Sequence, residues 1–319
     1  MKQPNKAKIL MQNILLTPVG WMLHLLAWMP WWVIWANADV LYVVAYRLLG
    51  YRKKIVRKNL TDSFPDKSPE ELHTIERQFY RNFADYFFET VKLLHISDSD
   101  MQRHMVFHNV DYIDDGIERG QSVMMYASHL FNWEWITSIT LWFRESTRAR
   151  GNVLGQAYHP LENQWFDRFF LRLRNRYSTC FPSKQILHMM VDKQREGHYM
   201  ALGFISDQHP MPNDQKHVVK FLNHPTAIIT GTEGIARLLD MRVGYFWMRR
   251  VSRGHYDCTV IPMCEHARLT PKGQLTDQYA QLLEQNIEEQ TPLWLWTHNR
   301  WKRPVQYSHQ EHKNEETKQ

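Results

Sequence analysis

One stretch of the chain decides its fold: Ser122-Val-Met-Met-Tyr-Ala-Ser-His-Leu-Phe-Asn-Trp-Glu-Trp-Ile-Thr-Ser-Ile-Thr-Leu-Trp-Phe143. Its first part, Ser122–Ala127, is an unbroken apolar run with the length of a strand that is buried on both faces. Its last part, Trp133–Phe143, is apolar over a length that favours a helix. We therefore predict a buried strand, a turn over residues 128–132 and then a helix.

Strands and helices alternate along the rest of the chain. Further strands are predicted at Tyr199–Ile205, Val243–Met248 and Tyr256–Ile261. Helices are predicted at Gln164–Arg174, Ser183–Arg195, Thr230–Leu239 and Leu275–Glu289. This alternation is typical of the α/β class, in which helices cover both faces of a central sheet.

An N-terminal capping signal marks one more helix. Ser68-Pro-Glu-Glu71 combines a serine N-cap, a proline at the first helical position and a glutamate three residues after the cap. The helix that follows carries Phe79, Phe83, Phe87 and Val91 at steps of four residues, and we expect this stripe to be buried in the core.

The N-terminal part of the chain is apolar and rich in tryptophan. Between Ile9 and Tyr46 the only formally charged side chain is Asp39. The segment Ile14–Ala36 is long enough to cross a hydrocarbon core of about 30 Å. The basic cluster after it is stronger than the one before it, so the positive-inside rule places the rest of the chain in the cytoplasm. We predict a membrane anchor, either a spanning helix or a hairpin lying in one leaflet; a helical pair packed on the chain's own main domain is the alternative.

The composition supports a membrane surface as partner. The chain has 319 residues, 13% aromatic residues including 13 tryptophans, and a formal net charge of +6. Tryptophan and basic side chains suit the headgroup region of an anionic bilayer. No nucleic-acid-binding motif is present, so we expect no nucleic acid partner. The three cysteines and 17 histidines lack the spacing of metal ligands, and we predict free thiols and no metal site.

His129 and Glu134 are the candidate catalytic residues. On a continuous helix, side chains five positions apart point about 140° away from each other. They can meet if His129 lies in the strand-to-helix turn and Glu134 in the first helical turn. Glu134 would then accept the imidazole N–H and orient the ring, and His129 would act as a general base toward a hydroxyl.

The surroundings of this pair resemble a known family. The segment His129–Glu134 resembles the H-x₄-[D/E] block of the lysophospholipid-acyltransferase-like superfamily and, more narrowly, of the late (secondary) lipid A biosynthesis acyltransferases. Other family-like segments follow in order: Arg57-Lys-Asn-Leu60 with Phe64-Pro65, Tyr158-His-Pro160, Arg176, Ser206-Asp-Gln208, Phe221 with Pro225-Thr-Ala227, and Trp296-Thr-His-Asn-Arg300-Trp-Lys-Arg-Pro304. The resemblance covers Leu15 to Pro304. The chain departs from the family pattern at His159, Ser206 and Pro292.

The resemblance implies a fold, a reaction and a set of site residues. The expected fold is glycerolipid-acyltransferase-like, with a central mixed sheet covered by helices; residues 1–52 form the anchor, 53–304 the catalytic domain and 305–319 a disordered polar tail. The expected reaction moves a fatty acyl group from an acyl carrier protein (or coenzyme A) thioester to a hydroxyl of a lipid A precursor, an anionic lipid, at the cytoplasmic face of the bacterial inner membrane. No cofactor other than the acyl thioester is expected. The implied substrate-binding residues are Asn132, Tyr158, Arg176, Asp207, Gln208 and Arg300.

Three alternatives remain open at this point. The same chemistry suits another lipid acceptor, such as a glycerophospholipid, a phosphatidylinositol mannoside or an amino-acid lipid. A thioesterase needs only water in place of the acceptor hydroxyl. A non-enzymatic membrane-surface protein would use the basic and tryptophan-rich regions alone.

Overall fold

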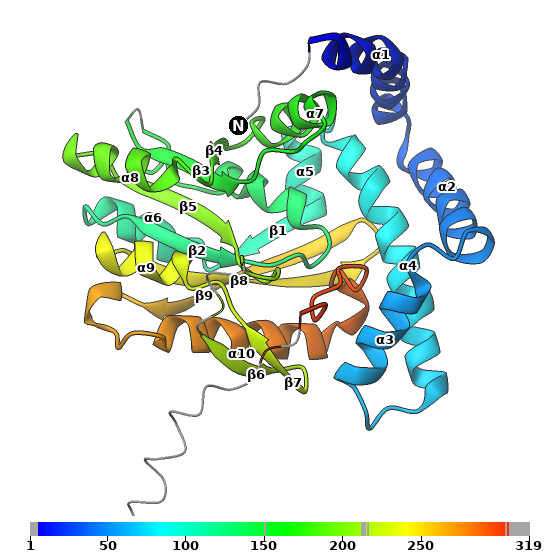
Figure 1. Ribbon diagram of the computed structural model, residues 1–319. Helices are drawn as coiled ribbons and strands as arrows, with labels where there is room; N and C mark the ends of the chain where they lie inside the picture. Colours follow the sequence, from blue (N-terminus) through cyan, green and yellow to red (C-terminus); the bar gives the residue numbers. More distant parts are fainter. Residues whose placement is uncertain (1–5, 150, 212–214, 216, 304, 306–319) are drawn as a thin grey trace, which may run out of the picture.

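A mixed seven-stranded sheet forms the centre of the computed structural model, which describes residues 6–149, 151–211, 215, 217–303 and 305 (Figure 1). The strand order is β1-β9-β8-β2-β5-β3-β4. Neighbouring strands are parallel except for the antiparallel pair β8–β9, so β1 and β9 run against the other five. The strands are β1 (Met105–His108), β2 (Val123–Ala127), β3 (Val153–Tyr158), β4 (Thr179–Pro182), β5 (Met200–Ile205), β8 (Arg242–Ser252) and β9 (His255–Cys264). The predicted mixed α/β sheet is confirmed.

Strand β2 lies in the middle of this sheet. It pairs in parallel with β5 on one side and with β8 on the other, and all five of its residues are buried. A strand covered on both faces has no solvent-facing side. This explains why its sequence is an unbroken apolar run instead of an alternating one.

Helices pack around the sheet. They are α3 (Lys53–Ser63), α4 (Pro69–Lys92), α5 (Asp98–His104), α6 (Asp111–Glu118), α7 (Gln164–Arg174), α8 (Ile186–Arg195), α9 (Gly231–Leu238) and α10 (Gln274–Glu289). Four of them, α7 to α10, were predicted within three residues at either end. In Figure 1, α10 runs along the lower side of the molecule and α7 lies at its upper side. The segment predicted as a helix after residue 132 is a helix of the tighter 3₁₀ type, η2 (Trp133–Leu141).

Two N-terminal helices stand out from the body at the upper right of Figure 1. They are α1 (Lys6–Trp28) and α2 (Trp31–Tyr42), and Pro30, which cannot donate a helical hydrogen bond, lies at the break between them. Helix α2 continues into a π-helix, η1 (Val43–Leu48), and packs against α4. Large apolar side chains on their outer face are exposed, so this face is not buried by the described part of the chain; they include Trp21, Leu25, Trp28, Trp32 and Val40.

The described helices do not contain one that is both long and apolar enough to cross a bilayer by itself. The pair formed by Trp31–Leu48 and Lys53–Ser63, bent by 85°, meets the length and composition requirement together. The division between an anchor over residues 1–52 and a catalytic domain over residues 53–304 stays a prediction. The predicted tail, 305–319, lies outside the described residues except for Val305.

Helix α4 begins as its sequence predicts. The Ser68 hydroxyl accepts from the Glu71 backbone N–H at 3.3 Å, and the Glu71 carboxylate accepts from the Ser68 N–H at 2.7 Å. Along the helix Phe79, Phe83 and Val91 are buried, but Phe87 is 43% exposed. The predicted apolar stripe was therefore wrong at that one position.

Some elements were not predicted. Strands β1 and β4 have only four residues each and lie at the two edges of the sheet, and only one residue of β3, next to β4, is fully buried. The hairpin β6 (Val218–Phe221) and β7 (His224–Ala227) forms a separate two-stranded sheet. None of these carries the long apolar run that marks β2.

The contact between α10 and β8 gives a test of stability. The Asn286 side chain is fully buried, donates to the Met248 carbonyl at 2.8 Å and accepts from the Met248 N–H and the Tyr245 hydroxyl, each at 3.1 Å. Asn286→Ala leaves these buried groups unpaired, so we expect the free energy of unfolding to fall by about 2–3 kcal/mol. The exposed neighbour Gln285, substituted by Ala, should change it by less than about 0.5 kcal/mol in the same denaturation experiment. Equal losses in the two variants would contradict the assignment.

Candidate active site

His129 and Asp207 come from the ends of two neighbouring parallel strands. In the β2–β5 pairing Ala127 is opposite Ile205, and in each strand one serine separates that residue from the site residue. Parallel strands present their carboxyl ends at the same edge of a sheet. The two side chains therefore meet, with His129 Nδ1 2.7 Å from Asp207 Oδ1.

Asp207 is a buried carboxylate with a full set of donors. Its Oδ2 accepts from the backbone N–H of His129 at 2.9 Å and from the indole N–H of Trp294 at 2.8 Å. Burial alone would raise the pKa of Asp207, but attraction to His129 and these hydrogen bonds outweigh burial and lower its pKa to about 2. Asp207 is therefore ionised at neutral pH and fixed in place.

This contact sets the tautomer of His129. Since Asp207 accepts at Nδ1, the neutral imidazole carries its proton there and presents a lone pair at Nε2. The side-chain amide nitrogen of Gln208 lies 3.2 Å from Nε2, and the Trp133 ring meets the imidazole edge to face with 5.0 Å between centroids. Nε2 can thus accept a proton from a hydroxyl that replaces the Gln208 amide.

Glu134 has a different set of partners from the one predicted. Its buried carboxylate receives two hydrogen bonds from Arg174, Nε to Oε2 at 2.7 Å and Nη2 to Oε1 at 2.6 Å. Tyr86 and the Trp133 indole also donate to Oε1, at 3.3 and 3.2 Å. The predicted contact of Glu134 with the imidazole N–H of His129 was wrong, because Asp207 occupies that position.

The path of the loop explains this difference. After β2 the backbone of Leu130 bridges to Trp294, and the Phe131 N–H donates to the Leu293 carbonyl at 3.1 Å. The loop therefore runs beside the C-terminal segment before η2 begins. Glu134, in the first turn of η2, then contacts Arg174 of α7. A buried carboxylate needs a cation or several donors, and Arg174 at the end of α7 provides the cation.

A cleft of about 510 Å³ opens beside the two pairs. Its polar wall includes His129, Glu134, Arg174, Tyr158 and Gln208. The remaining lining is largely apolar: Ala127, Trp133, Ile136, Ala157, Leu161, Gly203, Ile205, Met211, Ile229 and Phe246, with Gln156, His159 and His209. The structure thus brings four of the predicted site residues to one cleft, namely His129, Glu134, Tyr158 and Gln208, and places Asp207 directly behind His129.

A small apolar pocket adjoins the cleft. It has a volume of about 40 Å³, is lined mostly by aliphatic and aromatic side chains, and shares Ile136, Gln156, Gly203 and Phe246 with the cleft. Its other lining residues include buried core side chains such as Met125. A polar cleft beside an apolar pocket suits a substrate with a reactive carbonyl on a hydrocarbon tail.

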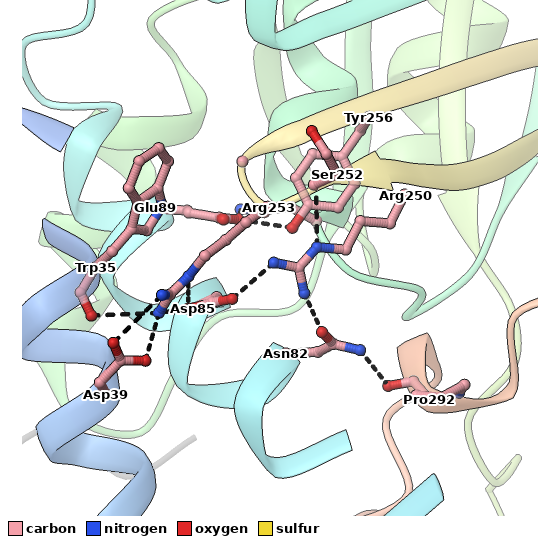
Figure 2. A network of polar contacts seen from close by, with 12 residues as sticks. Trp35, Asp39, Asn82, Asp85, Glu89, Arg250, Ser252, Arg253, Tyr256 and Pro292 are labelled. Atoms are coloured by element: carbon pink, nitrogen blue, oxygen red, sulfur yellow. Dashed lines mark hydrogen bonds and ion pairs between the residues drawn. The ribbon is translucent and has the colours of Figure 1, made fainter. Parts of the chain in front are cut away.

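Asn132 does not line the cleft but belongs to a buried layer behind it. Its amide donates to Glu89 Oε2 at 3.3 Å, and the Tyr256 hydroxyl donates to the same oxygen at 2.7 Å (Figure 2 shows Glu89 and Tyr256). The Trp135 indole donates to the Glu89 backbone carbonyl at 3.2 Å. Glu89 on α4 therefore fastens the segment that carries His129 to the body of the protein.

The two remaining predicted arginines are held by the protein itself. Arg176 donates to backbone carbonyls that follow α4, among them Leu93 at 2.7 Å. Arg300 is buried, donates to the Ala227 carbonyl and lies 3.4 Å from Nδ1 of His209, which lines the cleft. Burial lowers the pKa of Arg300 to about 10. Both arginines position neighbouring backbone or side chains.

Two functional roles were missed from the sequence. Arg174 was only one of several basic residues, but it ends the predicted helix Gln164–Arg174, where a cation interacts favourably with the helix dipole. Glu89 lies in the helix that carries Phe79 and Phe83 and is buried. It is six positions after Phe83, which places it about 120° around the helix from that residue, so the predicted stripe gave no signal for its burial.

Comparison with known proteins identifies the family of the chain. The model of one protein family, described as bacterial lipid A biosynthesis acyltransferase, matches residues 5–303. The lipid A biosynthesis palmitoleoyltransferase of Escherichia coli (strain K12) is 23% identical over 305 residues, which cover 89% of this chain and 94% of that protein. A lipid A biosynthesis acyltransferase of Shigella flexneri matches with the same identity and coverage. The chain belongs to the bacterial lipid A biosynthesis acyltransferase family.

Proposed function

We propose that the protein transfers a fatty acyl group from an acyl carrier protein thioester to a hydroxyl of a lipid A precursor, with His129 as general base. The observation that carries this proposal is the His129–Asp207 pair at a cleft with a largely apolar lining and a small apolar pocket beside it. Family membership supports the acyl transfer and the lipid A acceptor. The acyl carrier protein thioester is the proposed donor because a thioester is an activated acyl group with a good leaving group.

The proposed step begins with the acceptor hydroxyl at Nε2 of His129. Its oxygen attacks the thioester carbon as its proton moves to Nε2, and Asp207 stabilises the imidazolium that forms. The tetrahedral intermediate then collapses with cleavage of the carbon–sulfur bond. His129 returns the proton to the departing sulfur, which leaves an ester on the acceptor and a free thiol on the carrier.

We assign Glu134 a role through Arg174. The guanidinium is held by two short hydrogen bonds at the wall of the cleft that His129 also lines. A fixed positive charge there would stabilise the oxyanion of the tetrahedral intermediate. Glu134 is then a positioning residue, and Gln208, which lies beside His129 Nε2, supplies a further donor at the cleft.

The apolar features match the two lipid substrates. The acyl tail would enter the interior past Ile136 and Phe246, which line both the cleft and the apolar pocket beside it. The exposed tryptophans of α1 and α2 would lie in the headgroup region of the inner membrane, on its cytoplasmic face, so that the acceptor reaches the cleft from the bilayer. A helical pair that lies on the membrane surface in this way does not need to cross the bilayer.

The first test concerns the pair itself. His129→Ala should lower the rate of transfer from acyl carrier protein to a lipid A precursor by about 10²- to 10⁴-fold, because the proton acceptor is lost. Asp207→Asn should lower kcat over the same range with little change in KM, since the imidazole loses its fixed tautomer. Circular dichroism of each variant controls for folding. Near-normal turnover in folded His129→Ala protein would exclude the proposal, and fatty acid release at the same rate with and without acceptor would indicate a thioesterase.

The second test asks whether Glu134 and Arg174 act as one unit. Glu134→Gln and Arg174→Met should each lower kcat, by about 10²- to 10³-fold. The double variant should lose little more kcat than either single variant, because each substitution removes the same positioned charge. In a matched double-mutant cycle of Arg174→Met with Asp207→Asn, the two losses of kcat should be closer to additive. Additive losses for Glu134 and Arg174 would contradict the assigned role.

The third test uses the buried carboxyl of Glu89. Burial raises its pKa to about 7; Arg250 opposes this rise, Asp85 adds to it, and hydrogen bonds from Tyr256 and Asn132 oppose it. A carboxyl with a raised folded-state pKa stabilises the fold fully below its unfolded value of about 4.5 and loses that contribution as pH rises through about 7. The melting temperature of the wild type should therefore fall relative to that of Glu89→Gln between pH 5 and pH 8. A constant difference across this range would contradict the assigned pKa.

A further inference from the structure

A second cleft is bounded by α2, η1, α4 and the β8–β9 hairpin. It has a volume of about 750 Å³ and shares no lining residue with the catalytic cleft. Figure 2 shows much of its polar wall from close by. The lining residues are Asp39, Tyr42, Val43, Arg47, Gln78, Arg81, Asn82, Asp85, Arg250 and Arg253.

The inner wall of this cleft is a built charge network. Arg250 and Arg253 both bind the buried carboxylate of Asp85, with nitrogen–oxygen distances of 2.7 and 2.6 Å. Arg253 also binds Asp39 on α2 at 2.7 Å, and Arg250 donates to Asn82 on α4 (Figure 2). The network joins three elements and holds the two guanidinium groups in fixed positions.

The cleft as a whole has an excess of positive charge. Four arginines and two aspartates line it, which gives a net formal charge of +2. Arg47 and Arg81 are exposed, and neither forms an ion pair within the described part of the chain. The guanidinium carbon of Arg81 lies 5.3 Å from the centre of the Tyr42 ring, and this contact restricts the positions that the guanidinium group can take. The cleft is therefore a cationic site with two unneutralised guanidinium groups at its rim.

An unpartnered apolar surface adjoins this site. Val43 lines the cleft and is 43% exposed, and Val40 on α2, Leu48 on η1 and Leu49 directly after η1 are 63%, 72% and 74% exposed. This surface leads onto α2 and α1, whose exposed tryptophans were described above. A cationic site next to exposed aliphatic side chains suits a molecule that carries both an anionic phosphate and hydrocarbon chains.

We propose that this cleft binds the phosphate headgroup of an anionic phospholipid in the bilayer on which α1 and α2 lie. The inference rests on the proposed membrane docking but not on the catalytic residues. Charge complementarity selects the anionic headgroup, since a zwitterionic lipid brings no net charge to balance the excess at Arg47 and Arg81. The bound lipid acts as an attachment point, separate from the acceptor that enters the catalytic cleft.

The experiment compares binding of the full-length protein to vesicles. Flotation with phosphatidylcholine vesicles measures attachment through the apolar surface, and vesicles with 30% phosphatidylglycerol add the anionic headgroup. Arg47→Gln/Arg81→Gln should weaken binding to the anionic vesicles by about 30-fold, from the usual contribution of two basic residues near such a surface. Binding to phosphatidylcholine should not change. The matched control, Lys54→Gln/Arg77→Gln, removes two exposed charges on neighbouring α3 and α4 outside the cleft and should weaken anionic binding several-fold less.

The outcomes separate this proposal from the proposed function. Equal losses in the two double variants would overturn the proposal, because they would indicate attraction spread over the surface. So would wild-type binding that does not depend on phosphatidylglycerol, or an Arg47/Arg81 variant with a raised KM for acyl carrier protein and normal vesicle binding. Turnover with detergent-dispersed substrates should be normal in both double variants. Failure of the catalytic assignment would show in the His129→Ala assay and would leave the vesicle result unaffected.

Discussion

The in-register parallel pairing of β2 and β5 is the constraint on which the site depends. It fixes Ala127 opposite Ile205, and two residues further on it leaves His129 beside Asp207. A shift of one residue in this pairing would turn one of the two side chains to the other face of the sheet. All five residues of β2 are buried, so such a shift would also force side chains of different size into packing positions occupied by others. The reactive geometry is thus a consequence of how the centre of the sheet packs.

Buried carboxylates are costly, and each one near the site is compensated in a different way. Asp207 has backbone and indole donors in addition to the imidazole, whereas Glu134 has a bidentate arginine. Glu89 has two neutral donors and a raised pKa. Removing one partner of such a group leaves its charge or dipole unpaired in a low dielectric. This requirement ties the loop after β2 to α4, α7, β9 and the C-terminal segment, and it makes the site rigid.

Features of the site set by residues close in sequence could be predicted, whereas contacts between residues far apart in sequence could not. Local patterns predicted β2, β5, the capping box of α4 and the helix Gln164–Arg174, because each is set by neighbours within a few residues. The partner of His129 was misassigned because the choice between Glu134 and Asp207 depends on which strands are adjacent, and that is a long-range property. A hint was present: the two predicted strands are each followed by serine and then by a titratable residue. Combined with parallel pairing, this offset would have indicated Asp207.

Helix α4 contacts both the cationic cleft and the segment behind the catalytic cleft, through residues that are one helical turn apart. Asp85 and Glu89 are one helical turn apart, so they lie on the same side of α4, where Arg250 from β8 lies close to both. Asp85 faces the arginines of the outer cleft, whereas Glu89 accepts from Asn132 in the segment that carries His129. One guanidinium therefore lies close to a carboxylate of the cationic cleft and to a carboxylate behind the active site. In the proposed membrane-bound enzyme, α4 would hold the catalytic loop at a fixed distance from the bilayer, because Asp85 and Glu89 lie on one rigid helix.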